Sequence, residues 1–366
     1  MSTSPFMTPS HRRRRREASL RRRRQRRAIF AGALALILVA AVVVIALARP
    51  GATHGSPSAA ARHHPKAHSS TAIYVRPTRS AIGLPLGTPP LTLTGIGAPS
   101  GRGAVHLAFR KPPRTGLLFN LDTGQVLWQR NASLRLPVAS LTKMMTALIA
   151  VESEPPSAPV LVTRQAVAEG GSKVGVLPLG KRVRLESMLY GLMLPSGNDA
   201  AVALAQHISG TIPAFVARMN QEAARLGLGC TRYSSPSGFY DAGNYSCAID
   251  LAELAHADLA QPRIARVVHT FTAALPFPIK GGKLYLYNNN PLLRYAYPGV
   301  TGLKTGWTVQ AGDCLVATAE RHGVRLGVVL LHSTGLATQA SQLLNRGFEG
   351  VYHQTPVPQP PIPPGA

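Results

Sequence analysis

Acidic residues are scarce in this chain of 366 residues, where 15 Asp and Glu stand against 40 Lys and Arg and the formal charge is +25. An excess of this sign is typical of nucleic-acid-binding proteins when the cations cover one face of a domain. Here the excess is concentrated, because residues 11–27 contain eleven arginines and a single acid, Glu17. A solvated run beside a membrane explains it, so we expect no nucleic-acid partner.

Charged residues are absent from Ala28–Ala48, 21 residues that are apolar throughout. At about 1.5 Å per residue, a helix of this length spans the roughly 30 Å hydrocarbon core of a bilayer. By the positive-inside rule we predict a single transmembrane anchor, with the basic residues 1–27 in the cytoplasm and the rest of the chain outside. Secretion after signal cleavage is the alternative, because Ala46–Ala48 resembles a cleavage site, although Arg49 and Pro50 follow it unfavourably. A twin-arginine export signal is a further alternative.

Metal-binding partners are missing around the histidines of the next segment. His63, His64 and His68 have no acidic residue or cysteine near them, and residues 49–103 are rich in Pro, Gly, Ser, Thr and Ala. Such a composition cannot bury enough apolar surface to fold, so we predict a disordered linker over residues 49–103. The Pro-rich residues 353–366 are predicted to form a disordered tail.

Internal repeats are also absent, and residues 104–352 are long enough for one domain. Strand-like segments come first, at residues 104–109 and in a hairpin around Asp122–Gly124. Helical patterns and further strands follow, with helices at residues 140–152, 185–207, 212–226 and 251–259, strands at 302–308, 313–320 and 324–333, and a last helix at 338–348. This order predicts an α+β fold in which an antiparallel sheet packs against a helical block.

One apolar helical pattern contains a lysine where neither packing nor the helix dipole favours it. Ser140 stands at the expected N-cap of the helix, and Lys143 lies in its first turn. Because residues three apart share one face of a helix, the two side chains are expected to meet. Burial lowers the pKa of a lysine, so a neutral Lys143 would take the proton of Ser140 and make it a nucleophile.

The Ser-x-x-Lys pattern alone is too frequent by chance to assign a function. Two further patterns follow it in the chain: Ser-Gly-Asn at 196–198, on a predicted turn, and Lys-Thr-Gly at 304–306, on a predicted strand. Each by itself is explained as an ordinary turn or a strand end. Their conjunction, in this order and at domain-scale spacing, is the signature of active-site serine penicillin-binding enzymes.

Residues 104–350 resemble the low-molecular-mass penicillin-binding proteins, the serine-type D-alanyl-D-alanine carboxypeptidases. Beyond the three patterns, residues 120–133, 189–210 and 297–308 are similar to segments of that family. The resemblance implies a penicillin-binding and β-lactamase-like fold. It also implies a location at the bacterial cell membrane, with peptidoglycan stem peptides ending in D-Ala-D-Ala as substrates and β-lactams as covalent inhibitors.

The resemblance assigns roles in the reaction. Ser140 is implied to attack the carbonyl between the two D-alanines and to become an acyl-enzyme. Lys143 would be its base, and Ser196 would relay the proton to the leaving amine. Backbone N–H groups of Ser140 and Trp307 would form the oxyanion hole. No metal or organic cofactor is expected.

The same resemblance implies the substrate contacts. Asn198 would hydrogen-bond the peptide, while Lys304 and Thr305 would bind its terminal carboxylate. Gly306 would let the substrate backbone lie along the strand as an added β-strand. Trp307 stands where relatives often have His or another polar residue, so the lip of the site departs from the family pattern.

Other functions on the same residues stay open. A transpeptidase or an endopeptidase would use the same three patterns. A non-catalytic wall-binding protein is a further alternative, disfavoured by the intact Ser140 and Lys143. A β-lactamase is not expected, because no Glu-x-x-Leu-Asn-like segment lies between Lys143 and Ser196.

Three cysteines permit at most one disulfide within the chain, and three pairings are possible. Cys314 lies in a strand-like apolar run, where a thiol packs as a small core residue. Cys230 and Cys247 are flanked by polar and turn-forming residues, and glycines between them let the chain fold back. In an exported protein we therefore predict a Cys230–Cys247 bridge and a buried Cys314, with three unpaired cysteines as the alternative.

Overall fold

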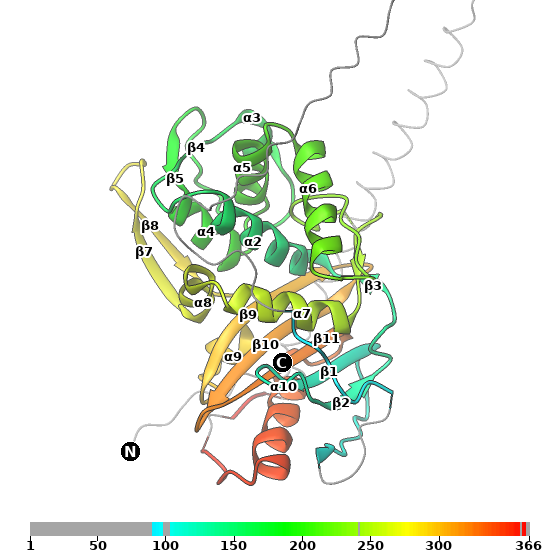
Figure 1. Ribbon diagram of the computed structural model, residues 1–366. Helices are drawn as coiled ribbons and strands as arrows, with labels where there is room; N and C mark the ends of the chain where they lie inside the picture. The colour runs from blue at the N-terminus through cyan, green and yellow to red at the C-terminus, as the bar shows by residue number, and fades with distance from the viewer. Residues whose placement is uncertain (1–89, 98–102, 241, 359–360, 364–366) are drawn as a thin grey trace, which may run out of the picture. The chain divides into compact units, whose positions relative to one another are not determined.

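The computed structural model describes residues 90–97, 103–240, 242–358 and 361–363, all of which lie in one unit of the chain (Figure 1). The predicted membrane segment at residues 28–48 and the histidines of residues 63–68 lie outside the described residues. Within the described part, no single helix is long and apolar enough to cross a bilayer. Among these residues, only α5 (Asn198–Ser209) and α6 (Ile212–Arg225) taken together, bent by 86°, reach that length and composition.

A five-stranded antiparallel sheet forms the centre of the unit, with the strands in the order β2-β1-β11-β10-β9. These strands are β1 (Thr115–Asn120), β2 (Val126–Arg130), β9 (Val300–Thr308), β10 (Gly312–Arg321) and β11 (Val324–Ser333). The predicted hairpin around Asp122–Gly124 is confirmed as β1 and β2, and the three predicted C-terminal strands are confirmed as β9, β10 and β11. The β1–β11 pairing therefore joins the beginning and the end of the domain.

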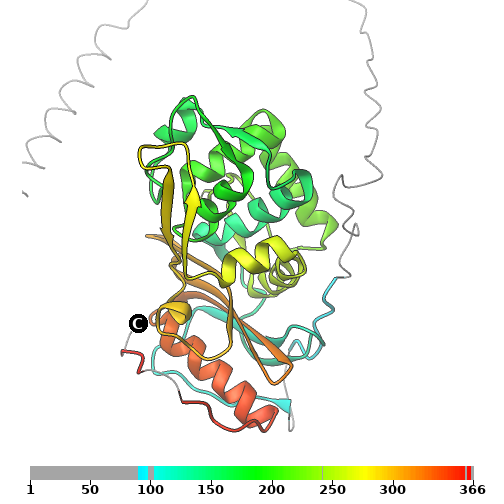
Figure 2. The ribbon, with the colours of Figure 1, turned by 90° about the vertical axis from the view of Figure 1, so that its left-hand side faces the viewer.

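Both faces of the sheet are covered, which explains the uninterrupted apolar runs of its strands. Leu117 and Phe119 of β1 pack into a core with the helical block, whereas Leu118 packs into a second core with α10 (Leu336–Asn345). On the face of the helical block, α7 (Ala248–Leu259) lies across the sheet (Figures 1 and 2). Since side chains alternate between the two faces of a strand, every residue of β1 is buried.

The helical block is built around α2 (Lys143–Ser153), whose residues from Lys143 to Val151 are all buried. It is surrounded by α4 (Leu185–Met193), α5 (Asn198–Ser209), α6 (Ile212–Arg225), α7 and α8 (Pro262–His269). A helix that is covered on all sides needs no polar face, which accounts for the apolar sequence of α2. Lys143, at its first residue, is thereby placed inside the protein.

Short elements complete the unit. The turns and short helices are η2 (Ala139–Thr142, 3₁₀), α3 (Arg164–Ala168), α9 (Pro291–Arg294) and η3 (Arg346–Val351, π). The small hairpins pair β3 (Leu136–Pro137) with β6 (Tyr245–Ser246), β4 (Pro159–Leu161) with β5 (Arg182–Arg184), and β7 (Thr272–Pro276) with β8 (Lys283–Tyr287). The β7–β8 hairpin packs against α4 and projects at the side of the helical block (Figure 1).

Two predicted elements differ from the structure. Residues 104–109 form no strand, although the N–H of Val105 donates to the carbonyl of Leu127. The helical pattern predicted at residues 185–207 forms two helices, because α4 ends at Met193 and α5 begins at Asn198, and the break includes Ser196 and Gly197 of the predicted turn. Proline lacks the N–H that a continuing helix needs, and Pro195 stands in this break.

The folded part extends beyond the predicted domain limits at both ends. In the segment assigned to the linker, the N–H of Leu91 donates to a carboxylate oxygen of Glu253 at 2.6 Å. In the segment assigned to the tail, the side-chain amide of Gln354 donates to the carbonyl of Arg321, and Ile362 packs against the second core. These described residues of the predicted linker and tail therefore contact the folded domain.

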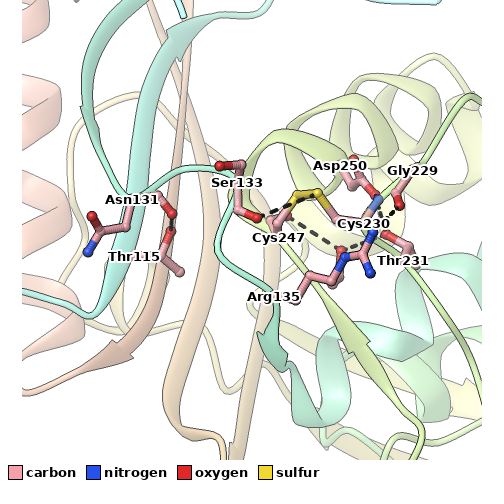
Figure 3. The surroundings of a disulfide bond; sticks show 10 residues. Thr115, Asn131, Ser133, Arg135, Gly229, Cys230, Thr231, Cys247 and Asp250 are labelled. Atoms are coloured by element: carbon pink, nitrogen blue, oxygen red, sulfur yellow. Dashed lines mark hydrogen bonds between the residues drawn. A yellow bond between two sulfur atoms is a disulfide. The ribbon is translucent and has the colours of Figure 1, made fainter. Parts of the chain in front are cut away.

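Cys230 and Cys247 form the predicted disulfide, with 5.7 Å between their Cα atoms (Figure 3). Cys314 is buried in β10, also as predicted. A carboxylate oxygen of Asp250 accepts a hydrogen bond from the N–H of Cys230 at 2.7 Å. These groups are the only cluster of three possible metal ligands found among the described residues, and the disulfide already uses both sulfur atoms.

Candidate active site

Ser140 lies in the 3₁₀ turn η2, directly before α2. The prediction that it caps the helix is wrong, because the residue at the N-cap of α2 is Thr142 and no side chain caps that end. The Ser140 hydroxyl instead accepts a hydrogen bond from Nζ of Lys143 at 2.7 Å. The tighter winding of the 3₁₀ turn places residues three apart over one another, so the serine faces the lysine rather than the helix N–H groups.

Lys143 is fully buried, and its amine has two hydrogen-bond acceptors, the Ser140 hydroxyl and the carbonyl of Ser237 at 2.8 Å. Burial lowers the pKa of Lys143 well below its ordinary value, and the nearby Lys304 lowers it further, against the opposing effect of Asp199 and Glu169. A neutral amine at hydrogen-bond distance from a hydroxyl is a general base for that hydroxyl.

The segment that carries Ser237 was not identified from the sequence as part of the site. Gly238 has a φ of +70°, and a Cβ at this position would lie 1.9 Å from the carbonyl oxygen of Ala139. The hydroxyl of Thr146, on α2, donates to the carbonyl of Pro236. Glycine thus permits the close approach that brings the Ser237 carbonyl to Lys143. The only sequence signal for this segment is its turn-forming residues, Ser, Pro and Gly at positions 234–238.

Ser196 and Asn198 stand at the break between α4 and α5. Ser196 has a φ of +66°, and its hydroxyl oxygen is buried with no hydrogen-bond partner among the described residues. The side-chain amide of Asn198 donates to the carbonyl of Gly170 at 2.7 Å, while its oxygen Oδ1 is buried and has no partner in the part of the chain that the structure describes. Buried polar atoms are nearly always paired, so both atoms fit a site at which a substrate supplies the missing partners.

Asp199, which the sequence patterns did not single out, holds the loop at residues 170–175 next to the site. Its carboxylate accepts hydrogen bonds from the backbone N–H groups of Val174 and Gly175 at 2.9 and 3.1 Å. The backbone N–H of Asn198 donates to the carbonyl of Ser172 at 2.7 Å. Residues 170–175 are thereby held against the start of α5, with Ser172 facing the cleft.

The Lys-Thr-Gly pattern lies on β9, at the edge of the sheet, and packs against η2. Lys304 is 1% exposed, its amine donates to the carbonyl of Thr305 at 2.9 Å, and burial lowers its pKa to about 7. A Cβ on Gly306 would lie 2.9 Å from both the Ser140 nitrogen and the Val138 carbonyl oxygen. Only glycine therefore lets β9 approach the serine turn this closely.

The cleft above Ser140 has two compartments. The first, about 350 Å³, includes Thr305 and Ser196 and is called the Thr305 compartment. The second, about 360 Å³, includes Asn198 and is called the Asn198 compartment. Ser140 and Trp307 line both, and the Trp307 side chain is 63% exposed.

The structure thus brings together all eight residues singled out from the sequence, with Lys143 and Lys304 buried and the other six at the surface of the cleft. Sequence reasoning missed several further residues that line it, among them Ser172, Phe239, Asn289 and Asp313. Each comes from a loop or strand end whose sequence has no distinctive pattern.

Comparison with known proteins shows to which family the chain is similar. The family model described as D-alanyl-D-alanine carboxypeptidase matches residues 113–335. The chain is 37% identical over 227 residues to D-alanyl-D-alanine carboxypeptidase DacF of Bacillus subtilis, a match that covers 60% of this chain and 58% of DacF, less than two thirds of its length. It is 33% identical to a D-alanyl-D-alanine endopeptidase of Pseudomonas aeruginosa, over 61% of this chain and 72% of that protein. The crystal structure of the Streptomyces K15 DD-transpeptidase is similar with a TM-score of 0.62 and 31% identity, covering 66% of this chain and 99% of that one.

Proposed function

Because the chain belongs to the family of D-alanyl-D-alanine carboxypeptidases, we propose that it removes the terminal D-alanine from peptidoglycan stem peptides through an acyl-enzyme on Ser140. The observation that carries the proposal is the contact of 2.7 Å between the Ser140 hydroxyl and the amine of a fully buried Lys143. A serine is a weak nucleophile unless a base takes its proton. The amine of Lys143 contacts the serine hydroxyl, and its lowered pKa lets it act as that base.

In the acylation step, Lys143 takes the hydroxyl proton and Oγ of Ser140 attacks the carbonyl between the two D-alanines. The negative charge on the carbonyl oxygen is stabilised by the backbone N–H groups of Ser140 and Trp307. Ser196 relays the proton to the amine of the terminal D-alanine, which leaves as the C–N bond breaks. A water molecule then hydrolyses the ester, which releases the shortened peptide and restores the serine.

The two compartments divide the substrate at the scissile bond. The terminal D-alanine, whose carboxylate binds Lys304 and Thr305, occupies the Thr305 compartment. The preceding part of the stem peptide lies along β9 in the Asn198 compartment, where Oδ1 of Asn198 accepts a hydrogen bond from it. β-Lactams present a carbonyl and a carboxylate in a comparable arrangement, and they acylate Ser140 as covalent inhibitors.

The proposal includes a place at the bacterial cell membrane. The apolar run at residues 28–48 forms a single-pass anchor, which keeps residues 1–27 in the cytoplasm and the catalytic domain outside. Fractionation of cells that produce the full chain, with protease added from outside, tests this. Recovery of a chain shortened at its N-terminus from the medium would instead support cleavage and secretion.

Labelling of the full chain with a fluorescent penicillin tests the nucleophile. The unaltered protein is expected to form a covalent adduct and to release D-alanine from a peptide ending in D-Ala-D-Ala. Ser140→Ala is expected to lose both activities and to keep its fold. The matched control is Ser133→Ala, a change at a nearby exposed serine, which should retain both. A stable adduct on Ser140→Ala would show that another residue is the nucleophile. An unaltered protein that is folded but never labelled would favour a wall-binding protein.

A further inference from the structure

One residue that lines the Thr305 compartment, Asn289, also belongs to a row of exposed residues along β8. Asn289, which lines that compartment, follows Tyr287 at the end of β8, and its N–H donates to the carbonyl of Leu194, next to the Ser196 turn. Position 289 continues the outward alternation of the strand. The exposed residues at the odd positions are Lys283, Tyr285, Tyr287 and Asn289, which we call the β8 outer row.

The even positions of the same segment face the protein. Leu284, Leu286, Asn288 and Asn290 are buried, and the side-chain amide of Asn288 donates to the carbonyls at positions 268 and 270. The alternation thus continues for two residues beyond the last β8 hydrogen bonds. Because side chains alternate between the two faces of a strand, burial of the even positions directs the odd positions away from the protein, and these are exposed.

Two large aromatic side chains on this row stand opposite small residues of β7. Tyr285 and Tyr287 are each 65% exposed, and their cross-strand partners on β7 are the small residues Ala274 and Thr272. Exposed tyrosine rings suit a binding surface, because they combine apolar faces with a hydrogen-bonding hydroxyl. The two residues lie about 7 Å apart along the strand, at about 3.4 Å per residue.

Charge at the far end of the row suits an acidic polymer. Lys283 belongs to the row, Lys280 lies in the turn of the hairpin, and none of residues 270–290 is acidic. Peptidoglycan carries carboxylates on its stem peptides, and its sugar rings have apolar C–H faces that stack on aromatic side chains. The β8 outer row therefore matches such a polymer in both respects.

We propose that the β8 outer row binds the glycan chain of a peptidoglycan strand, with sugar rings against Tyr285 and Tyr287. Because the row begins at the Thr305 compartment, this is the strand beyond the scissile bond, whose stem peptide reaches the site from the leaving-group side. The inference rests on the proposed function, which assigns that compartment to the residue beyond the scissile bond. A terminal D-alanine alone needs no such surface, whereas a cross-linked peptide, the substrate of the endopeptidase alternative on the same residues, brings a second strand to this side of the site.

Binding of the full chain to purified peptidoglycan sacculi tests the proposal. For the double variant Tyr285→Ala/Tyr287→Ala we expect the dissociation constant to rise about tenfold or more, the effect of losing two stacking contacts. Tyr285→Phe/Tyr287→Phe keeps the rings and should bind nearly as well as the unaltered chain. Leu161→Ala, at a 40% exposed residue on the separate β4–β5 hairpin, is the matched control and should not weaken binding. The assay is run in detergent at about 0.3 M salt, so that the arginines of residues 11–27 are screened.

Two further measurements separate the possible failures. Release of D-alanine from a short soluble peptide should be the same in the double variant and the unaltered chain, since such a peptide does not reach the row. No release by the unaltered chain would overturn the proposed function, whereas normal release with unchanged sacculus binding in the double variant would overturn only the present inference. Glycan chains freed of peptides should compete with the sacculi. Competition by free stem peptides alone would show that the row binds peptide and not sugar.

Discussion

Lys143 and Lys304 are both withdrawn from water, but the proposed reaction needs them in opposite protonation states. The pKa of Lys143 is lowered by burial and by Lys304, so its amine is available as a base. Lys304 must instead carry a proton when it binds a carboxylate. Each lysine is therefore tested by replacement with arginine, which stays protonated throughout the physiological pH range.

Lys143→Arg is expected to lower the rate of penicillin acylation about 10³-fold, because a guanidinium cannot serve as the general base. Lys304→Arg keeps a cation for the carboxylate and should retain part of the activity. Acylation rates of the two full-length variants, measured with the same labelled penicillin, compare them directly. Equal residual rates would contradict the division of labour between the two lysines.

Substrate binding is expected to weaken as the pH rises, because the pKa of Lys304 is about 7 in the protein without ligand. Below this pH the amine is protonated and attracts the carboxylate; above it the attraction is lost, so KM should rise by up to about tenfold per pH unit. Measurement of kcat and KM for D-alanine release between about pH 6 and about pH 9 tests this. The rise should be confined to KM and absent from Lys304→Arg. A rise of the same size in that variant would assign the pH dependence to another group.

At the scale of elements, the site depends on how closely the edge strand β9 approaches the turn η2. β9 is the edge strand of its sheet, and η2 is a single 3₁₀ turn. Neither could supply the site alone, since the serine comes from one and the carboxylate-binding residues from the other.

Gly306→Ala is expected to reduce the acylation rate about 10²-fold while the protein stays folded. The added Cβ would lie 2.9 Å from the Ser140 nitrogen and the Val138 carbonyl oxygen, so β9 and η2 must separate and the reacting groups lose their alignment. Gly350→Ala is the matched control, because a Cβ there meets no atom within 4 Å. Acylation rates and thermal unfolding of both variants should be compared. An unimpaired Gly306→Ala would show that the close approach is not needed for catalysis.

At the scale of the whole molecule, the disulfide connects stability with the site. Cys230 and Cys247 are separated by 17 residues, and the loop between them contains Ser237, whose carbonyl accepts a hydrogen bond from Lys143. The bridge restricts the unfolded chain, while the loop is also held by hydrogen bonds from α2 to its carbonyls.

Replacement of both cysteines by alanine is expected to lower the free energy of unfolding by about 3 kcal/mol, from the loop-closure entropy. Penicillin labelling of the folded variant should persist, because Thr146 and Lys143 still hold the Pro236 and Ser237 carbonyls. Denaturant unfolding of the variant and of the unaltered chain, each with and without reductant, measures the effect. Reductant should shift only the unaltered chain. If the variant were as stable as the unaltered chain, the bridge would not stabilise the fold as proposed.

The sequence by itself determined the family, the α+β class and the residues that make up the three patterns, and the comparisons confirm the family and the fold. It also determined the strands with strong apolar runs, and it favoured the Cys230–Cys247 pairing that the structure confirms. These features depend on local periodicity or on short motifs, which are formed by residues close together in the sequence. The roles of the individual site residues and the membrane anchor stay predictions.

Only the tertiary structure decided how those residues meet. Ser140 lies in a 3₁₀ turn and not at a helix cap, and the second acceptor for Lys143 is a carbonyl 94 positions away in the chain. Asn289 reaches the cleft because a hairpin packs beside α4, and Asp199 matters because its carboxylate holds a distant loop. Such contacts follow from the packing of whole elements against each other. No local pattern predicts them, because the backbone carbonyl that completes some of them is common to every residue type, and the backbone N–H that completes the others is common to all but proline.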